Sequence, residues 1–343
     1  MRKALLYIAL FSLTLLTGCE EMFYREVDFK GDTEPEMLVV TSNLGVNQIP
    51  HVYVSHSFFF DRTDKSPLDW ITDAAVSLSV NGKAYTLTYR SEDCTYANLS
   101  MPALRPLDTV DIVATHPKYA TGTVRQIMPG QIRCKVSSYE QLPTNQIAFR
   151  LDLDPYSGNP DDVIGIRAGG SLRIIEKRTY GGEERTDTNY IYLKTLYSND
   201  VVFAEAANAS ADGYYGAPSG YYLYFPASAL REPKSIQLFV DDQQLGSHWL
   251  SYATVQAEEL VVDVIACTYS GYRFDQSTRS SYYMKALPTP SHLPQQDMNI
   301  MEEIAVAIQS MLGDQEPVQV YSNVEGGLGH VAAYSRDYHL IEF

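Results

Sequence analysis

The sequence predicts a mainly β protein with two domains, an N-terminal immunoglobulin-like β-sandwich and a C-terminal β-rich domain with two helices. Short apolar or alternating runs recur at regular spacing, and turn residues separate them, as in antiparallel sandwiches. Hydrophobic residues make up 45% of the 343 residues, which speaks for folded domains. A chain of this length is too long for one hydrophobic core, so we expect two domains.

The N-terminus predicts export and a lipid anchor. Arg2 and Lys3 precede an apolar run over residues 4–16, which is too short for a membrane span and fits a secretory signal. The run leads into Leu16-Thr17-Gly18-Cys19, which resembles the bacterial lipobox. We therefore expect a lipoprotein signal peptide over 1–18, acylation of Cys19 and a tether over 19–35. The alternative is a soluble secreted protein with a chance cysteine.

The charge balance excludes nucleic acid as an expected partner. Removal of Arg2 and Lys3 with the signal leaves 24 basic against 42 acidic residues, a formal net charge of −18. Such a surface repels phosphate backbones. Keeping the protein soluble is the simpler explanation of this negative charge. Glu20 and Glu21 directly follow Cys19 and resemble the surface-export signal of Bacteroidota lipoproteins, so we expect outward display. The alternative is an ordinary charged linker.

The first domain is expected over residues 36–130. Asn81-Gly82 gives a two-residue hairpin turn, and Met128-Pro129-Gly130 breaks the strand pattern at the proposed boundary. The expected strands cover residues 37–41, 52–55, 75–80, 84–89, 109–114 and 119–124.

The second domain is expected over residues 131–343. One helix is predicted near 277–287, before Pro288, and another near 297–312, where apolar residues fall at helical spacing before Gly313. The expected strands cover residues 147–153, 163–166, 171–175, 190–196, 221–225, 235–240 and 260–267.

No catalytic motif, cofactor fingerprint or metal-binding histidine spacing occurs, so we expect no cofactor and no enzyme activity. A hydrolase with an unrecognised site is the remaining enzymatic alternative. Cys94, Cys134 and Cys267 match no zinc pattern. One disulfide with an odd thiol and three unpaired cysteines are equally compatible with their spacing.

The run Ser322-Asn323-Val324-Glu325-Gly326-Gly327-Leu328-Gly329, followed by a strand ending in Tyr334-Ser335, resembles the close of a Bacteroidota lipoprotein family. That family is catalogued as domain of unknown function 4249. The segments 38–40, 71–76 and 104–109 agree with it in order, and the stretch 154–162 departs from it. The resemblance implies an outer-membrane lipoprotein, often encoded beside a TonB-dependent transporter, and it carries over no catalytic residue.

The family motif itself favours a structural role. Gly326, Gly327 and Gly329 allow positive φ or a close backbone approach, and Ser322, Asn323 and Glu325 precede them. We expect two strands joined by a glycine-rich turn. A loop that touches a ligand is the alternative.

Two further segments are candidate binding sites. Asp152, Asp154, Asn159 and Asp161 offer oxygen ligands around a turn, a weak calcium candidate for which an acidic surface turn is the preferred interpretation. Tyrosines in a Gly-rich stretch suit carbohydrate or protein contact, although some of them also begin a strand. The tyrosine candidates are Tyr214, Tyr215, Tyr221 and Tyr222.

The resemblance and the predicted anchor together give the expected function. We expect a non-enzymatic accessory or ligand-binding partner of a TonB-dependent outer-membrane transporter, held at the cell surface by the lipid on Cys19. The alternative is a surface adhesin or structural surface lipoprotein.

Overall fold

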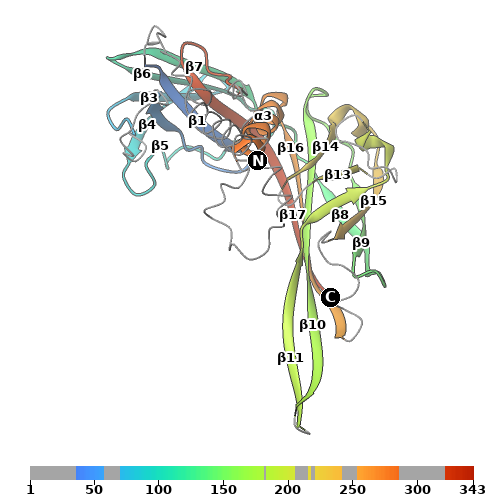
Figure 1. Ribbon diagram of the computed structural model, residues 1–343. Helices are drawn as coiled ribbons and strands as arrows, with labels where there is room; N and C mark the ends of the chain where they lie inside the picture. Colours follow the sequence, from blue (N-terminus) through green and yellow to red (C-terminus); the bar gives the residue numbers. More distant parts are fainter. Residues whose placement is uncertain are drawn as a thin grey trace, which may run out of the picture. The chain divides into compact units, whose positions relative to one another are not determined.

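Three β-sheets make up the described part of this computed structural model (Figure 1). The predicted mainly β fold class is confirmed. The predicted signal peptide, the tether with Cys19, Tyr214 and the helix expected at 297–312 lie outside the described residues. The structure describes residues 36–57, 70–180, 183–204, 215–217, 221–241, 253–285 and 321–343.

The first sheet has five strands in the order β5-β4-β3-β6-β7. The hairpin predicted at Asn81-Gly82 is confirmed, because these residues have φ of 50° and 82°, as this two-residue turn requires. The Asn81 amide donates to Asp108 (2.7 Å), and its carbonyl oxygen accepts from the Thr109 N–H (2.9 Å), which fixes the start of β6. The strands are β3 (Ala75–Val80), β4 (Lys83–Arg90), β5 (Thr95–Ala97), β6 (Thr109–His116) and β7 (Tyr119–Ile127).

The second sheet has seven strands in the order β11-β10-β16-β17-β1-β2, with β14 also paired to β10. The strands are β1 (Leu38–Gly45), β2 (Tyr53–His56), β10 (Val163–Tyr180), β11 (Glu183–Leu193), β14 (Leu223–Pro226), β16 (Ala253–Cys267) and β17 (Leu328–Glu342).

Strand β17 joins the two ends of the described chain. Its first half pairs in parallel with β1, from Val39 opposite Leu328 to Gly45 opposite Tyr334. Its second half pairs with β16 in the antiparallel sense. The predicted domain boundary at residue 130 falls between β7 and β8 and stays a prediction. It did not anticipate that β17, the last strand of the second predicted domain, pairs with β1 of the first predicted domain.

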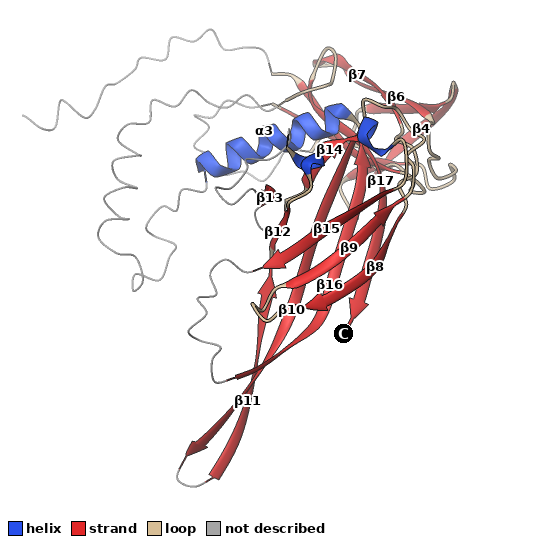
Figure 2. Cartoon of the chain, turned by 90° about the vertical axis from the view of Figure 1, so that its right-hand side faces the viewer, coloured by secondary structure: helices blue, strands red, loops and turns tan. Residues whose placement is uncertain are grey.

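The third sheet has five strands in the order β13-β12-β15-β9-β8 and packs face to face against β10, β16 and the second half of β17 (Figure 2). Phe149 and Leu238 from this sheet meet Ile164 and Val262 in one buried core. The alternation of buried and exposed residues along each strand produces this packing. The strands are β8 (Cys134–Gln141), β9 (Ile147–Leu153), β12 (Thr195–Ser198), β13 (Tyr215–Ala217) and β15 (Lys234–Asp241).

A separate core forms where β1 and β2 cover the first sheet. Leu38 and Val40 of β1 pack there with Leu78 and Ile112. The described residues therefore form two large sandwich-like cores, and the prediction of two domains from the length of the chain stays a prediction.

Helix α3 (Tyr269–Lys285) begins before the predicted start at Ser277. Gly271 lies in the first turn of the helix, and its N–H donates to the Thr268 hydroxyl (3.4 Å). Phe274 stacks on His330 of β17 at 4.0 Å between ring centroids. Burial lowers the pKa of His330 to about 4, so this imidazole is neutral at pH 7.

Two short 3-10 helices, η1 (Val201–Phe203) and η2 (Ala227–Leu230), complete the described elements. Both contribute buried apolar side chains, Phe203 and Leu230, to the larger core. Among the described residues, no helix is both long and apolar enough to cross a membrane.

Of the hairpin expected in the family motif, only the part from Tyr321 onward lies among the described residues. There, residues 321–327 form no strand paired with β17 and make single contacts instead. Glu325 forms an isolated bridge with Thr123 of β7. The Asn323 side chain pairs with the backbone of Val331, donating to its carbonyl and accepting from its N–H, both at 2.9 Å. The asparagine amide thus satisfies the backbone polar groups of Val331.

Candidate functional site

The four calcium candidates are not gathered into one site. Asp152 accepts a hydrogen bond from Ser235 (2.6 Å), and Asn159 accepts from the backbone N–H of Asp161 (3.1 Å). Asp154 follows β9, and its backbone N–H donates to Arg133. Among the described residues, no three Cys, His, Asp or Glu side chains in this segment bring ligand atoms within 4.8 Å of one another. The segment is better explained as a hydrogen-bonded acidic turn.

A neighbouring pair in this segment that the sequence did not single out consists of the partly buried Tyr156 and the buried Asp162. The Tyr156 hydroxyl donates to Asp162 (2.5 Å) and accepts from the Gly130 N–H (2.8 Å). Asp162 is 3% exposed. Burial raises the pKa of its carboxyl to about 6, although the hydrogen bond from Tyr156 opposes the shift.

We expect Asp162→Asn to stabilise the protein at pH 7.5 by about 1 kcal/mol, because the amide oxygen still accepts from Tyr156 and carries no buried charge. The folded-state pKa of Asp162, about 6, lies above the unfolded value of about 3.9. The native state therefore binds the extra proton, and this contribution to stability is lost as the pH rises through 6. Urea unfolding at pH 7.5 and 4.5 measures it.

The gain in stability from Asp162→Asn should be smaller at pH 4.5, where the Asp162 carboxyl of the parent protein is protonated. Asp161→Asn, at the exposed neighbour, is the control and should change stability little at either pH. A loss of stability in Asp162→Asn at pH 7.5 would contradict the assigned burial effect.

The tyrosine candidates are separated by the fold. Tyr215 lies in β13, and Tyr214 is outside the described residues. Tyr221 is half-buried against the larger core. Tyr222 instead donates a hydrogen bond to Asp263 of β16 (2.7 Å), on the other face of the seven-stranded sheet. Only Tyr222 among them leads to a candidate site.

Asp263 is the centre of a cluster formed with Arg167, Tyr222 and Arg336, here called the Asp263 cluster. Arg167 of β10 contacts its carboxylate at 2.6 Å, and Arg336 of β17 contacts it through two nitrogens at 2.6 and 3.1 Å. On β16 the neighbouring residues Val262 and Val264 face the core, so Asp263 faces the opposite side. The covering side chains leave it only 2% exposed.

The three partners keep Asp263 ionised. Burial alone would raise the pKa of this carboxyl, but hydrogen bonds from Arg336, Tyr222 and Arg167 outweigh it and hold the pKa below its ordinary value. The Asp263 carboxylate raises the pKa of the Tyr222 phenol, in addition to burial. The single acid in the apolar run 260–266 was the sequence signal that could have found this cluster.

Two hollows flank the Asp263 cluster on the solvent face of the sheet. One of about 510 Å³ is lined by Arg167, Asp263, Tyr192 and Tyr338, and another of about 390 Å³ by Arg167 and Arg336. Tyr192 and Tyr338 are 60% and 50% exposed. The guanidinium of Arg336 lies 5.2 Å from the Tyr338 ring. We call this surface, with its exposed tyrosines and arginines, the tyrosine–arginine face.

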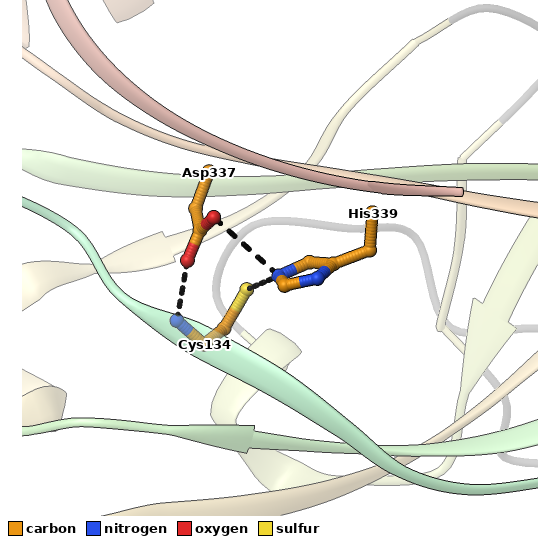
Figure 3. Close-up of side chains that lie close together, drawn as sticks. All are labelled: Cys134, Asp337 and His339. Carbon is orange, nitrogen blue, oxygen red and sulfur yellow. Dashed lines mark hydrogen bonds and ion pairs between the residues drawn. The ribbon is translucent and has the colours of Figure 1, made fainter. Parts of the chain in front are cut away.

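A second group of polar side chains joins distant parts of the chain. Cys134 of β8 lies beside Asp337 and His339 of β17 (Figure 3). The Cys134 sulfur is 3.3 Å from His339 Nε2, and Asp337 Oδ1 is 3.4 Å from the same nitrogen. A catalytic Cys–His–Asp relay needs the two contacts on opposite ring nitrogens. Burial and the Asp337 charge also raise the pKa of the thiol, so it is not an activated nucleophile.

Fold and surface together define a class, a two-core β-sandwich protein with an open, aromatic sheet face. The family model described as "Domain of unknown function (DUF4249)" matches residues 24–338, and the chain belongs to this family. A search of the curated proteins finds no match. The resemblance noted in the glycine-rich motif is thereby confirmed over nearly the whole chain.

Proposed function

We propose that this protein is a lipid-anchored, non-enzymatic accessory of a TonB-dependent outer-membrane transporter, which it contacts through the tyrosine–arginine face. The observation that carries the proposal is that face. Tyr and Arg, together with Trp, are enriched among the residues that dominate the binding energy of protein interfaces. On this face two tyrosines at least half exposed stand beside arginines already oriented by Asp263.

The predicted N-terminus supports the membrane part of the proposal. A lipid on Cys19 and a short tether would hold the folded body close to the membrane surface, where an integral transporter is within reach. A tethered partner is bound at a high effective concentration, so a face of moderate size is sufficient for a stable complex.

The arrangement of the Asp263 cluster supports a binding role for the face. Holding Arg167 and Arg336 in one geometry before binding lowers the side-chain entropy lost on association. The cluster presents no nucleophile with a base beside it, which favours recognition over catalysis.

The test is a pull-down of the tagged, lipidated protein from its native outer membrane in mild detergent, with mass spectrometry of the captured proteins. We expect a TonB-dependent transporter in near-stoichiometric amount. A double variant, Tyr192→Ala with Tyr338→Ala, should lower the recovered transporter at least about tenfold, because two interface tyrosines are removed.

Tyr139→Ala is the matched control. Tyr139 is 44% exposed, but it lies on β8 in the third sheet, away from the tyrosine–arginine face. Its change should leave the recovered transporter unchanged. An equal loss of recovered transporter in the double variant and in Tyr139→Ala would contradict the proposal. So would capture of the tagged protein without any transporter.

Surface adhesion is the second candidate function, favoured by one feature. Strands β10 and β11 form a hairpin that extends past the last partner of β10 on β16, at Glu176 (Figure 2). Among the described strands, its end, Lys177–Tyr180, is paired only with β11. An adhesin of this kind should bind cells or matrix without a transporter and lose binding when the hairpin is shortened.

A further inference from the structure

Cys134, Asp337 and His339 meet at an open edge between two sheets (Figure 3). Cys134 begins β8, the last strand of the third sheet. Asp337 and His339 are two residues apart on β17 and therefore project from the same side. Beyond Tyr334, β17 has left its partner β1, so this part of the strand is also an edge. Solvent can reach the group, since both β17 side chains are partly exposed.

The distances of the Cys134 sulfur and of the Asp337 oxygen from His339 Nε2 fit a tetrahedral ion, and all three ligand atoms lie within 4.8 Å of one another. Zinc bonds of about 2.3 Å to sulfur and about 2.0–2.1 Å to nitrogen or oxygen place neighbouring ligand atoms roughly 3.3–3.6 Å apart. Here Sγ and Nε2 are 3.3 Å apart, and Nε2 and Oδ1 are 3.4 Å apart. Both contacts converge on the same ring nitrogen, Nε2 of His339. This arrangement does not suit a catalytic relay, but it is the one that a shared ion requires.

The ligands are held in position by their surroundings. The second carboxylate oxygen of Asp337 accepts a hydrogen bond from the Cys134 N–H (2.8 Å), which orients both residues. Ser335, on the same side of β17, accepts from the Ile132 N–H (3.1 Å) and donates to the Gly130 carbonyl (2.6 Å). These bonds fix the start of β8 against β17 and lower the cost of assembling the ligands.

We propose that Cys134, Asp337 and His339 bind one Zn²⁺ ion, with water in the fourth position. Sulfur, imidazole and carboxylate together suit zinc, whereas calcium and magnesium prefer oxygen alone. On binding, the thiol proton leaves to solvent, and the thiolate and carboxylate balance the ion's two positive charges. This site is independent of the transporter role and of the tyrosine–arginine face.

The experiment uses the full chain, purified in detergent with chelator and then dialysed free of it. Titration with Zn²⁺ should show one equivalent bound. Titration with Co²⁺ should give the near-ultraviolet thiolate-to-cobalt charge-transfer band, which only a cysteine ligand produces. Cys134→Ser should abolish this band. His339→Ala and Asp337→Asn should each lower Zn²⁺ affinity at least about tenfold, since even an outer partner of a metal ligand costs that much.

Cys94→Ser is the matched control, because Cys94 is also a free, partly exposed thiol but lies in the turn before β5. Its cobalt band and zinc stoichiometry should equal those of the parent. Circular dichroism checks that each variant is folded. Added Zn²⁺ should raise the unfolding temperature of the parent and of Cys94→Ser. It should not raise the unfolding temperature of Cys134→Ser or of His339→Ala.

Three outcomes overturn the proposal. The parent binds no zinc, the cobalt band persists in Cys134→Ser, or it disappears in Cys94→Ser. If Cys134→Ser does not fold, the affinities of His339→Ala and Asp337→Asn decide, and values equal to the parent's reject the site.

Discussion

Gly329→Ala is expected to destabilise the protein by roughly 3 kcal/mol. Gly329 has φ of 111°, a region in which an L side chain is strained. It pairs with Val40 of β1, and a Cβ atom there would overlap the Val40 carbonyl oxygen and lie 2.8 Å from its carbonyl carbon. The parallel β1–β17 ladder would have to separate at this point. Urea unfolding of parent and variant measures the loss.

Gly82→Ala separates backbone strain from the close approach. Gly82 also has positive φ, 82°, but nothing lies within 4 Å of the position its Cβ would take. We expect a loss of only about 1 kcal/mol there. Equal losses in the two variants would show that contact with β1 is not what requires glycine in the family motif.

Asp263→Asn is expected to cost about 2 kcal/mol at pH 7. The change leaves two arginines facing an amide, and removal of one partner from a buried ion pair costs about 3–5 kcal/mol. We expect less here because the two arginine side chains are 40% and 45% exposed and water can solvate them. The variant should also weaken capture of the transporter, because Arg167 and Arg336 lose their fixed geometry.

The pH dependence of this loss has a definite sign. The folded-state pKa of Asp263 lies below its ordinary value, so its stabilisation is present above an unfolded pKa of about 3.9. It is lost as the pH falls through the folded pKa. The difference between parent and Asp263→Asn should therefore be full at pH 7 and shrink below pH ~4. Urea unfolding across this range, with the exposed Asp187→Asn as control, tests it. A difference that grows on acidification would contradict the assignment.

Local features could be predicted where the cause is local. The Asn81-Gly82 hairpin was predicted from two residues, because only a few types adopt its backbone angles. Alternating runs such as 75–80 gave strands in the expected places. Helix α3 was predicted with the wrong start, because Gly271 is tolerated where Thr268 accepts its N–H and Phe274 stacks on His330.

The candidate sites could not be assembled in the same way. Tyr222 lies in a tyrosine-rich stretch, but its partner Asp263 is 41 residues away on β16, and Arg167 lies on β10. Cys134 has no telling spacing to the other cysteines, and its neighbours Asp337 and His339 lie more than 200 residues further along the chain. Spacing rules describe ligands on one loop or helix and do not apply to ligands on two sheets.

By itself, the sequence determined the mainly β fold class, the family through its glycine-rich close, and the turn at Asn81-Gly82. These depend on periodicity and backbone preference, which neighbouring residues carry. Only the tertiary structure decided that β17 would pair with β1. It also brought Asp263 to its arginines and Cys134 to His339. Strand pairing between distant residues is selected by burial of whole sheet faces, and no short segment encodes it.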